Sequence, residues 1–574
     1  MASTFFMRCV GPLGGFALCA LVVAACVGDD PSVGPTGDGG TTTATGTEKK
    51  KGEPCADGDT CAGSVCADGF CCDSICGDTC GACNVKGHEG TCTPVTGMPV
   101  GKRVCKGTAT GTCAGACDGT LTTDCAYPTG SCGTTACTAG SSTAGTCSSG
   151  ACSTKMATCG DALCGASACA TVTRVAMGLD FACALLSDAT VRCWGDNSHG
   201  QLGQGPTDVT PHLVPTPVQG LPGPVASIGV GDLHSCAIMK KDGAVWCWGS
   251  NSDHQLGLGE AIGATVDNTA HGVPKAVCAT GSGLTCDPLI AATKVAGTDA
   301  ATCATVAGIG PPKCWGDGGY AKVTGYNAAG AVPPTANPAS VCGGGIAGST
   351  VVDLAMGNGT ACAVDSAGSV YCWGNNNSGK AGQPLAGDQV HCATQVFMNL
   401  PAGTNTALTN AKKVAISAYA TCALVGGGGV SCWGAGEARG NGTTNNTSNQ
   451  VTSVTPLAGA INAVAIAGGG AGVDGNTFCA ALADGTATCW GSDVNGEIGD
   501  GQPASAGSIY DHPTQVTNLP GKVIDVSGAS SGYAFCAVLA DQGVLRCWGY
   551  ARKGSLGNGS AIVGVQSSPV AQKW

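Results

Sequence analysis

Charged side chains are scarce in this sequence of 574 residues. Asp, Glu, Lys and Arg together make up 11% of it, and the excess of acidic residues gives a formal net charge of −12 at pH 7. A protein that binds nucleic acid needs a basic face to meet the phosphates. The composition therefore argues against a nucleic-acid partner, and the acidity mainly favours solubility.

Long apolar runs are missing after the first 26 residues, and no later segment is long and apolar enough to span a bilayer. Residues 1–26 carry one cation, Arg8, and an apolar stretch that ends in small residues, which is typical of a secretory signal peptide. The Val-Ala-Ala-Cys sequence that ends at Cys26 resembles a bacterial lipobox and predicts lipidation of the Cys26 thiol. The alternative is ordinary cleavage after Ala25, with Cys26 in a disulfide. Residues 27–54 are rich in Gly, Thr, Asp and Pro and predict a flexible tether.

Residues 55–169 lack the large apolar side chains of a conventional core; Phe70 and Tyr127 are the only aromatic residues there. Such a segment needs covalent staples, and it holds 20 of the 41 cysteines. Outside residues 1–26 the cysteines number 38, an even total that, with an export signal, predicts disulfides formed outside the cytoplasm. Zinc is the competing interpretation, for instance at the Cys80 and Cys83 pair. As a function, the module is either a stalk or a receptor- or polymer-binding unit.

A hairpin motif recurs seven times between residues 183 and 549: Cys-Ala, eight or nine residues, then Cys-Trp-Gly. A repeat of this length predicts a solenoid, a propeller or an array. In the second copy, two runs of alternating polarity flank a Lys-Lys-Asp-Gly turn, so that Cys236 lies opposite Cys247 on the neighbouring strand. Opposed strand residues are close enough for a disulfide. The predicted pairs are Cys183–Cys193, Cys236–Cys247, Cys303–Cys314, Cys362–Cys372, Cys422–Cys432, Cys479–Cys489 and Cys536–Cys547.

Alternation places the cysteines on one face of each hairpin, and the Ala and the Trp that follow them on the other. A polar, Gly-rich loop, a Pro-Val strand and a further apolar strand complete each repeat, for example at 195–203, 217–218 and 225–230. Four strands per repeat predict a propeller blade. The expected fold is therefore an all-β, seven-bladed β-propeller of four-stranded blades over residues 170–574, preceded by the small disulfide-rich module.

The repeat, ending Cys-Trp-Gly-x-Asn-x-x-Gly-Gln-Leu-Gly in its fullest copy, resembles that of the regulator-of-chromosome-condensation family. The resemblance covers about 70% of the chain, residues 171–574, and implies a seven-bladed propeller. As in that family, the last blade is expected to take its missing strands from the opposite terminus, since the chain ends soon after a Pro569-Val570 strand start. The third copy carries Pro311-Pro312 in its second strand, which predicts an irregular blade three.

Two longer intervals, 259–293 and 383–412, follow blades two and four. Repeat proteins often place insertions on a binding face. The four remaining cysteines lie in or near these intervals and predict the pairs Cys278–Cys286 and Cys342–Cys392.

Motifs that look catalytic have structural explanations. Residues 374–381 nearly match a phosphate-binding loop but end in Ala381 instead of the hydroxyl residue that binds magnesium, and they are one copy of the repeat's Gly-rich loop. Residues 528–532 match a nucleophile elbow in letters only. The eight His show no metal-ligand spacing, and His234 replaces a packing residue of other copies. We expect no enzyme activity, no catalytic or metal site and no cofactor.

The expected function is a lipid-anchored binding or scaffold protein at the outer membrane or cell surface of a Gram-negative bacterium. Its partner would be an envelope or extracellular protein or glycan, and only the lipid anchor would touch the membrane. An envelope hydrolase on a propeller scaffold is the alternative. Guanine-nucleotide exchange, known in the family's founding member, is the least expected because fold analogy alone does not transfer function.

Overall fold

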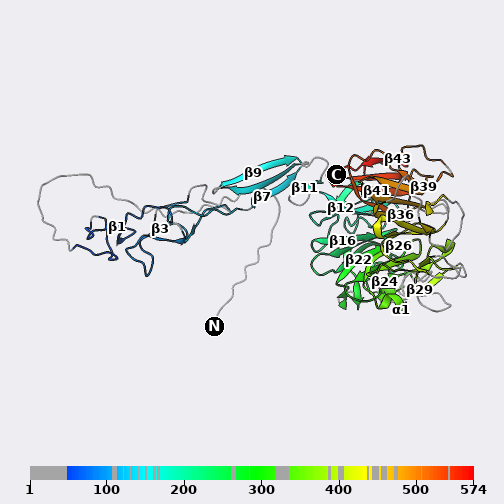
Figure 1. Ribbon diagram of the computed structural model, residues 1–574, viewed down its shortest axis with the longest axis horizontal. Helices are drawn as coiled ribbons and strands as arrows, with labels where there is room; N and C mark the ends of the chain where they lie inside the picture. Colours follow the sequence, from blue (N-terminus) through cyan, green and yellow to red (C-terminus); the bar gives the residue numbers. More distant parts are fainter. Residues whose placement is uncertain are drawn as a thin grey trace, which may run out of the picture. The chain divides into compact units, whose positions relative to one another are not determined.

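The computed structural model describes residues 48–574 with gaps, of which those of five residues or more are 106–112, 260–266, 318–334, 399–405, 443–451, 454–461 and 471–475. The chain forms two compact units, one of residues 1–104 with 116–126 and the other of 105–115 with 127–574. In Figure 1 the first unit is coloured blue, and the second runs from cyan to red. Among the described residues no helix has the length and apolarity to cross a membrane.

The first unit is held by disulfides between very short strands. Among the described residues these bonds join Cys55–Cys66, Cys61–Cys71, Cys72–Cys83, Cys76–Cys92 and Cys80–Cys117. Its strands are β1 (Val65–Ala67), β2 (Phe70–Cys72), β3 (Gly81–Ala82), β4 (Thr93–Pro94), β5 (Thr96–Gly97) and β6 (Cys117–Asp118). Residues 48–54, which the sequence places in the tether, belong to this unit. The Gly52 amide donates to the Cys71 carbonyl at 2.8 Å, and the Cys71 amide donates to the Glu53 carbonyl at 3.0 Å.

The second unit opens with a three-stranded antiparallel sheet, β7-β8-β9, and a two-stranded one, β10-β11. Disulfides Cys113–Cys147 and Cys132–Cys152 hold the first of these. The strands are β7 (Ser131–Thr138), β8 (Ser141–Ser148), β9 (Ala151–Thr158), β10 (Leu163–Cys164) and β11 (Cys169–Ala170).

Seven four-stranded antiparallel sheets follow, and they are the blades of a propeller. Figure 1 shows them side by side from β12 to β43. Blades one and two are β12 (Val172–Met177), β13 (Phe181–Leu186), β14 (Val191–Gly195), β15 (His212–Pro217), and β16 (Val225–Val230), β17 (His234–Met239), β18 (Val245–Asn251), β19 (Asp267–Ala276). Blades three and four are β22 (Ala292–Gly297), β23 (Ala301–Val306), β24 (Lys313–Gly316), β25 (Thr335–Ser340), and β26 (Val351–Gly357), β27 (Thr360–Asp365), β28 (Val370–Asn375), β29 (Gln389–Gln395).

Blades five, six and seven complete the ring. They are β32 (Ala411–Ile416), β33 (Ala420–Val425), β34 (Val430–Gly434), β35 (Thr452–Ser453); β36 (Ala463–Gly469), β37 (Thr477–Leu482), β38 (Ala487–Ser492), β39 (Ile509–Gln515); and β40 (Val523–Gly528), β41 (Ala534–Leu539), β42 (Leu545–Ala551), β43 (Gly564–Ala571). Three minor elements lie between blades: β20 (Cys278–Thr280) with β21 (Asp287–Pro288), β30 (Phe397–Met398) with β31 (Thr406–Ala407), and α1 (Gly344–Ala347). The 3₁₀ turns η3 (Asn377–Gly379) and η4 (Gly426–Gly428) lie within blades four and five.

The predicted seven-bladed, all-β architecture is confirmed, but the predicted way of closing the ring is wrong. Every blade is built from four consecutive strands, and blade seven takes all of its own from β40 to β43. No strand is exchanged between the ends of the propeller, because β43 pairs along β42, from Cys547 opposite Val570 to Ala551 opposite Gly564. Face packing closes the ring instead: Val175 and Trp194 of blade one share a buried core with Val538 of blade seven.

The two faces of each hairpin pack against different neighbours, as the alternation predicts. The Cys236–Cys247 pair of blade two contacts Ala304 and Trp315 of blade three in one buried cluster. In blade two itself, Ala237 and Trp248 pack against the disulfide of blade one. The same arrangement recurs at all seven interfaces, and each Ala and each Trp of the motif is fully buried. A small residue is needed there because a large indole and a disulfide fill the same layer.

The Gly-rich loop of one blade holds the Trp of the next. The indole N–H of Trp248 donates to the Gln201 carbonyl at 2.8 Å, and Trp194 donates to Ser555, which carries the pattern from blade seven to blade one. The next loop glycine, Gly203, has φ +69°, and a Cβ there would lie 3.1 Å from the Trp248 indole nitrogen. Glycine is required by both the conformation and the close approach.

Blade three is irregular where the sequence predicts it. Strand β24 is only four residues long and begins directly after Pro311-Pro312. It still pairs with both β23 and β25, so the irregularity stays within one strand.

Candidate functional site

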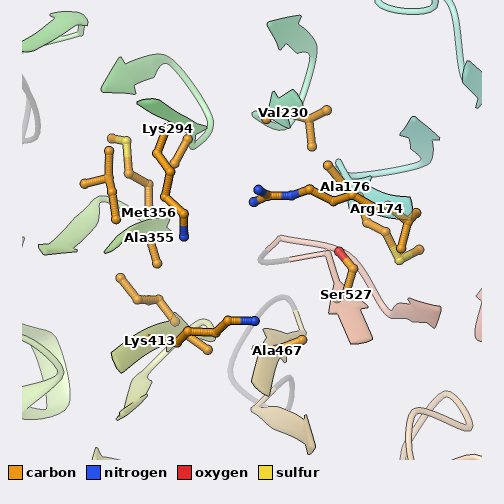
Figure 2. A pocket seen from close by; sticks show the side chains of 18 of the residues that line it. Arg174, Ala176, Val230, Lys294, Ala355, Met356, Lys413, Ala467 and Ser527 are labelled. Carbon is orange, nitrogen blue, oxygen red and sulfur yellow. The ribbon is translucent and has the colours of Figure 1, made fainter. Parts of the chain in front are cut away.

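The first strand of every blade lines a central channel. A cavity of about 370 Å³ is bounded by residues from β12, β16, β22, β26, β32, β36 and β40. Figure 2 shows three cationic side chains, Arg174, Lys294 and Lys413, which enter it from different sides and bring their nitrogen atoms towards the lumen.

The charged residues occupy the same place in each inner strand. All seven inner strands have a register shift after their first paired residue, for example between Val172 and Arg174 and between Ala411 and Lys413. The skipped residue, such as Lys412, is exposed to solvent. A bulge of this kind turns the strand and redirects the next side chain. The resulting ring, one residue per blade, is Arg174, Ser227, Lys294, Asp353, Lys413, Ala465 and Asp525.

Asp353 is the most firmly held member of this ring. One of its carboxylate oxygens forms an ion pair with Lys294, and the other accepts the Val414 amide at 2.8 Å. The Asp353 side chain is 4% exposed and that of Lys294 26%. Burial, reinforced by the nearby charges of Arg174 and Lys413, lowers the pKa of Lys294 to about 7.

Arg174 and Lys413 are held more loosely. The Lys413 Nζ atom lies 3.9 Å from an Asp525 carboxylate oxygen. Within the described part of the chain, the one hydrogen bond of the Arg174 guanidinium goes to the Ser227 hydroxyl at 3.3 Å. Burial lowers the pKa of Arg174, and the charge of Asp525 opposes that shift. Three basic side chains therefore face two carboxylates in this ring, and Lys294, whose pKa is about 7, is only partly charged at neutral pH.

A second layer, two residues further along each inner strand, consists of small side chains. Its members are Ala176, Gly229, Ala296, Ala355, Ala415, Ala467 and Ser527. Several of them are labelled beside the cations in Figure 2. Each blade therefore contributes an uncharged residue no larger than Ser beside the charged ring.

The structure joins all nine predicted cysteine pairs. In the seven blade pairs the Cα atoms are 4.0–4.1 Å apart, as expected of opposed residues in a non-hydrogen-bonded position. Cys278–Cys286 closes the β20-β21 hairpin. Cys342–Cys392 ties the segment after β25 to β29, the outer strand of blade four. Cys26 and the rest of residues 1–47 lie outside the described residues.

The structure divides the candidate zinc pair between two clusters, and Cys80 lies with Cys105, Cys117 and Cys125, whose sulfur atoms are all within 4.8 Å of one another. Cys80 is bonded to Cys117, and Cys83 to Cys72. A disulfide sulfur carries no thiolate for zinc.

The lookalike motifs take structural roles. Lys380, in the phosphate-loop lookalike, is fully buried, and its Nζ atom donates to the carbonyls of Asn358 and Ala418 at 2.7 and 2.9 Å. Residues 528–532 run from the end of β40 towards β41. His234 is a buried packing residue whose Nε2 atom lies 2.7 Å from the Thr302 hydroxyl, and burial lowers its pKa to about 4.

The sequence reasoning missed the charged ring. Its signal was present in the repeat, because aligning the seven inner strands on their bulges brings Arg174, Lys294, Asp353, Lys413 and Asp525 to one position. The alternation of the Cys-Trp hairpins predicts which side chains pack between blades and carries no information about the channel.

Comparison with known proteins agrees with the geometry of the blades. Models of the regulator of chromosome condensation repeat match residues 172–201, 225–255 and 351–380, and, in a second version, 188–238 and 242–296. The chain carries RCC1 repeats. These matched segments lie in blades one to four; blades five to seven share the motif and the four-stranded sheet.

Relatives of known sequence match over part of their length. The chain is 25% identical over 220 residues to the RCC1 domain-containing protein RUG3, mitochondrial, of Arabidopsis thaliana, which is 37% of this chain and 44% of that protein. It is 39% identical over 89 residues to the human E3 ubiquitin-protein ligase HERC2, 15% of this chain and 2% of that protein. The chain thus spans less than half the length of these relatives.

Two solved structures show the same fold. Human WBSCR16 aligns with a TM-score of 0.50 at 22% identity, covering 62% of this chain and 85% of that one. Yeast RCC1 (Prp20) aligns with a TM-score of 0.52 at 18% identity, covering 70% and 85%.

Proposed function

We propose that this protein is an exported, lipid-anchored binding scaffold whose propeller presents a rigid surface to an envelope or extracellular protein or polysaccharide. The observation that carries the proposal is the buried disulfide at every one of the seven blade interfaces. Disulfides form and persist in oxidising compartments. Seven equivalent pairs, together with the stapled first unit, suit a protein that works outside the cytoplasm.

The recognition surface in this proposal lies at the two disulfide-tied segments near blades two and four. Cys278–Cys286 fixes the β20-β21 hairpin, and Cys342–Cys392 spans 50 residues and fixes the connection between blades three and four. Fixing such segments before binding lowers the entropy lost on binding. Function in repeat scaffolds commonly sits on insertions of this kind.

Cell fractionation tests the export and anchoring. The full chain should enter the membrane fraction, and Cys26→Ser should release it from the membrane. Cys19→Ser, a cysteine within the predicted signal peptide, is the matched control and should leave the protein membrane-bound. Retention of Cys26→Ser in the membrane, or free thiols in the purified protein, would contradict the proposal.

Cross-linking to defined partners tests the binding. The purified, oxidised protein should bind at least one envelope protein or glycan saturably when the two purified components are mixed, and reduction and alkylation should abolish that binding. If the protein hydrolyses glycan or ester substrates and binds no partner, the result would favour the hydrolase alternative and contradict the scaffold proposal.

A further inference from the structure

We propose that the central channel binds a slender aliphatic monocarboxylate, with its carboxylate at the ring of Arg174, Lys294 and Lys413 and its chain along the small-residue layer. The channel is lined by the inner strands and is separate from the two disulfide-tied segments. It holds wherever the protein resides.

The charges of the ring favour an anion, and a singly charged one. Arg174 has five donors and, among the described residues, one hydrogen bond, to Ser227. Lys413 has only a 3.9 Å ion pair with Asp525. Both cations therefore have donors left for a ligand, and a guanidinium matches the two oxygens of a carboxylate. A dianion such as phosphate would place a second negative charge close to the fixed carboxylates of Asp353 and Asp525.

The shape of the channel favours a thin, apolar tail. Above the ring, five of the seven positions of the second layer are Ala, one is Gly and one is Ser. Such a layer carries no fixed charge, and its small residues leave room beside the ring for a few methylene groups. The volume of about 370 Å³ lies at the lower end of the range for small-molecule sites.

Lys294 and Asp353 position the other members of the ring. Asp353 fixes Lys294 through the ion pair and fixes the strand of Lys413 through the adjacent Val414 amide. Because Asp353 is nearly buried, its charge is satisfied inside the protein and leaves the cations facing the lumen. The ring is thus built before any ligand enters.

The test is calorimetric titration of the purified, oxidised full-length protein with hexanoate. Hexanamide, which has the same length and no charge, and inorganic phosphate are the comparison ligands. We expect one saturable hexanoate site per chain, with hexanamide and phosphate weaker on the order of tenfold or more, as the loss of a charge-assisted hydrogen bond predicts. Hexanamide binding as tightly as hexanoate, phosphate binding more tightly, or no hexanoate binding at all would overturn the proposal.

Variants locate the site. Arg174→Gln and Lys413→Gln should each weaken hexanoate binding on the order of tenfold. Lys412→Gln is the matched control, since it removes the same charge one residue earlier, at the exposed bulge position. Ala176→Leu should also weaken hexanoate binding, because the larger side chain fills part of the lumen while the charges of the ring stay in place. An equal loss in Lys412→Gln and Lys413→Gln would place the anion outside the channel. If Arg174→Gln fails to fold, Arg174→Lys, which keeps the charge but loses the fork, should bind with intermediate affinity.

Discussion

At the scale of single residues, one position of the Gly-rich loop is filled by Gln in some blades and by Glu in blade six. It is the position directly before the buried aliphatic residue of the loop, such as Leu202 or Ile498. Gln201 and Gln255 accept the backbone amide two residues earlier through their side-chain oxygens, at 2.9 and 2.8 Å. Glu497 does the same in blade six at 2.7 Å, and its other oxygen accepts the Asn495 side-chain amide. Burial raises the pKa of Glu497 to about 7, although those hydrogen bonds oppose the shift.

Replacing Glu497 by Gln should therefore stabilise the protein in a pH-dependent way. The raised pKa means that the folded state holds this proton more tightly than the unfolded state, so the associated stability is complete below the unfolded value of 4.5 and is lost as the pH rises through about 7. Glu497→Gln removes the buried charge and keeps an acceptor for the Asn495 backbone amide, although its NH2 group cannot accept the second bond, from the Asn495 side chain. At pH 8 we expect a gain of up to about 3 kcal/mol in the free energy of unfolding, falling towards zero near pH 5, measured by urea denaturation. An equal gain at both pH values would contradict this account.

At the scale of the element, the hairpin is the unit that the sequence specifies. Cross-strand pairing and the two faces could be predicted from Cys-Ala and Cys-Trp-Gly, since strand alternation has a strict period of two. The contact between one blade's disulfide and the next blade's Ala and Trp emerged from the structure. The bulge in each inner strand could not be predicted in this way. No Gly or Pro marks it in blades one and five, and the residue that follows it there is Arg174 or Lys413, which lines the channel.

Removing one hairpin disulfide should weaken the fold measurably. The Cys362–Cys372 bond closes a loop of 10 residues, for which chain entropy gives a stabilisation of about 2–3 kcal/mol. The double variant Cys362→Ala/Cys372→Ala should lose about that much in the free energy of unfolding.

The matched variant is Cys278→Ala/Cys286→Ala, whose bond spans 8 residues and holds a hairpin outside the seven four-stranded sheets. Chain entropy predicts nearly the same loss for its loop, so a larger loss in Cys362→Ala/Cys372→Ala would report the packing of the blade disulfide between two blades. The opposite order of the two effects would show that the blade disulfides are not part of the cooperative core.

At the scale of the whole molecule, ring closure was the feature that family resemblance predicted wrongly. The short segment after the last Pro-Val start suggested an incomplete blade, but β43 covers Gly564–Ala571 and completes blade seven. The start of the strand at Val172 then packs against blade seven by its face, with the Val172 amide donating to the Gly543 carbonyl at 2.8 Å.

A fragment of residues 170–574 should therefore fold without the segments that precede it. All seven sheets and nine of the disulfides lie within this range. Mass spectrometry after alkylation should find no free thiol, and circular dichroism should show a single cooperative transition. Scrambled disulfides or a loss of cooperativity would mean that the preceding residues are needed for the propeller.

The seven blade disulfides have short sequence separations, 10 or 11 residues each. In the exported protein that we propose, each one can consequently be oxidised as soon as its own hairpin has crossed the membrane, before any later blade has folded. Each blade cysteine then finds its partner within its own hairpin, and it does not compete with the other cysteines of the complete chain. Cys342–Cys392 is different, since its 50-residue span includes most of blade four and must wait for it. A time course of oxidation during secretion should therefore run in chain order, with this long-range bond forming after that of its own blade.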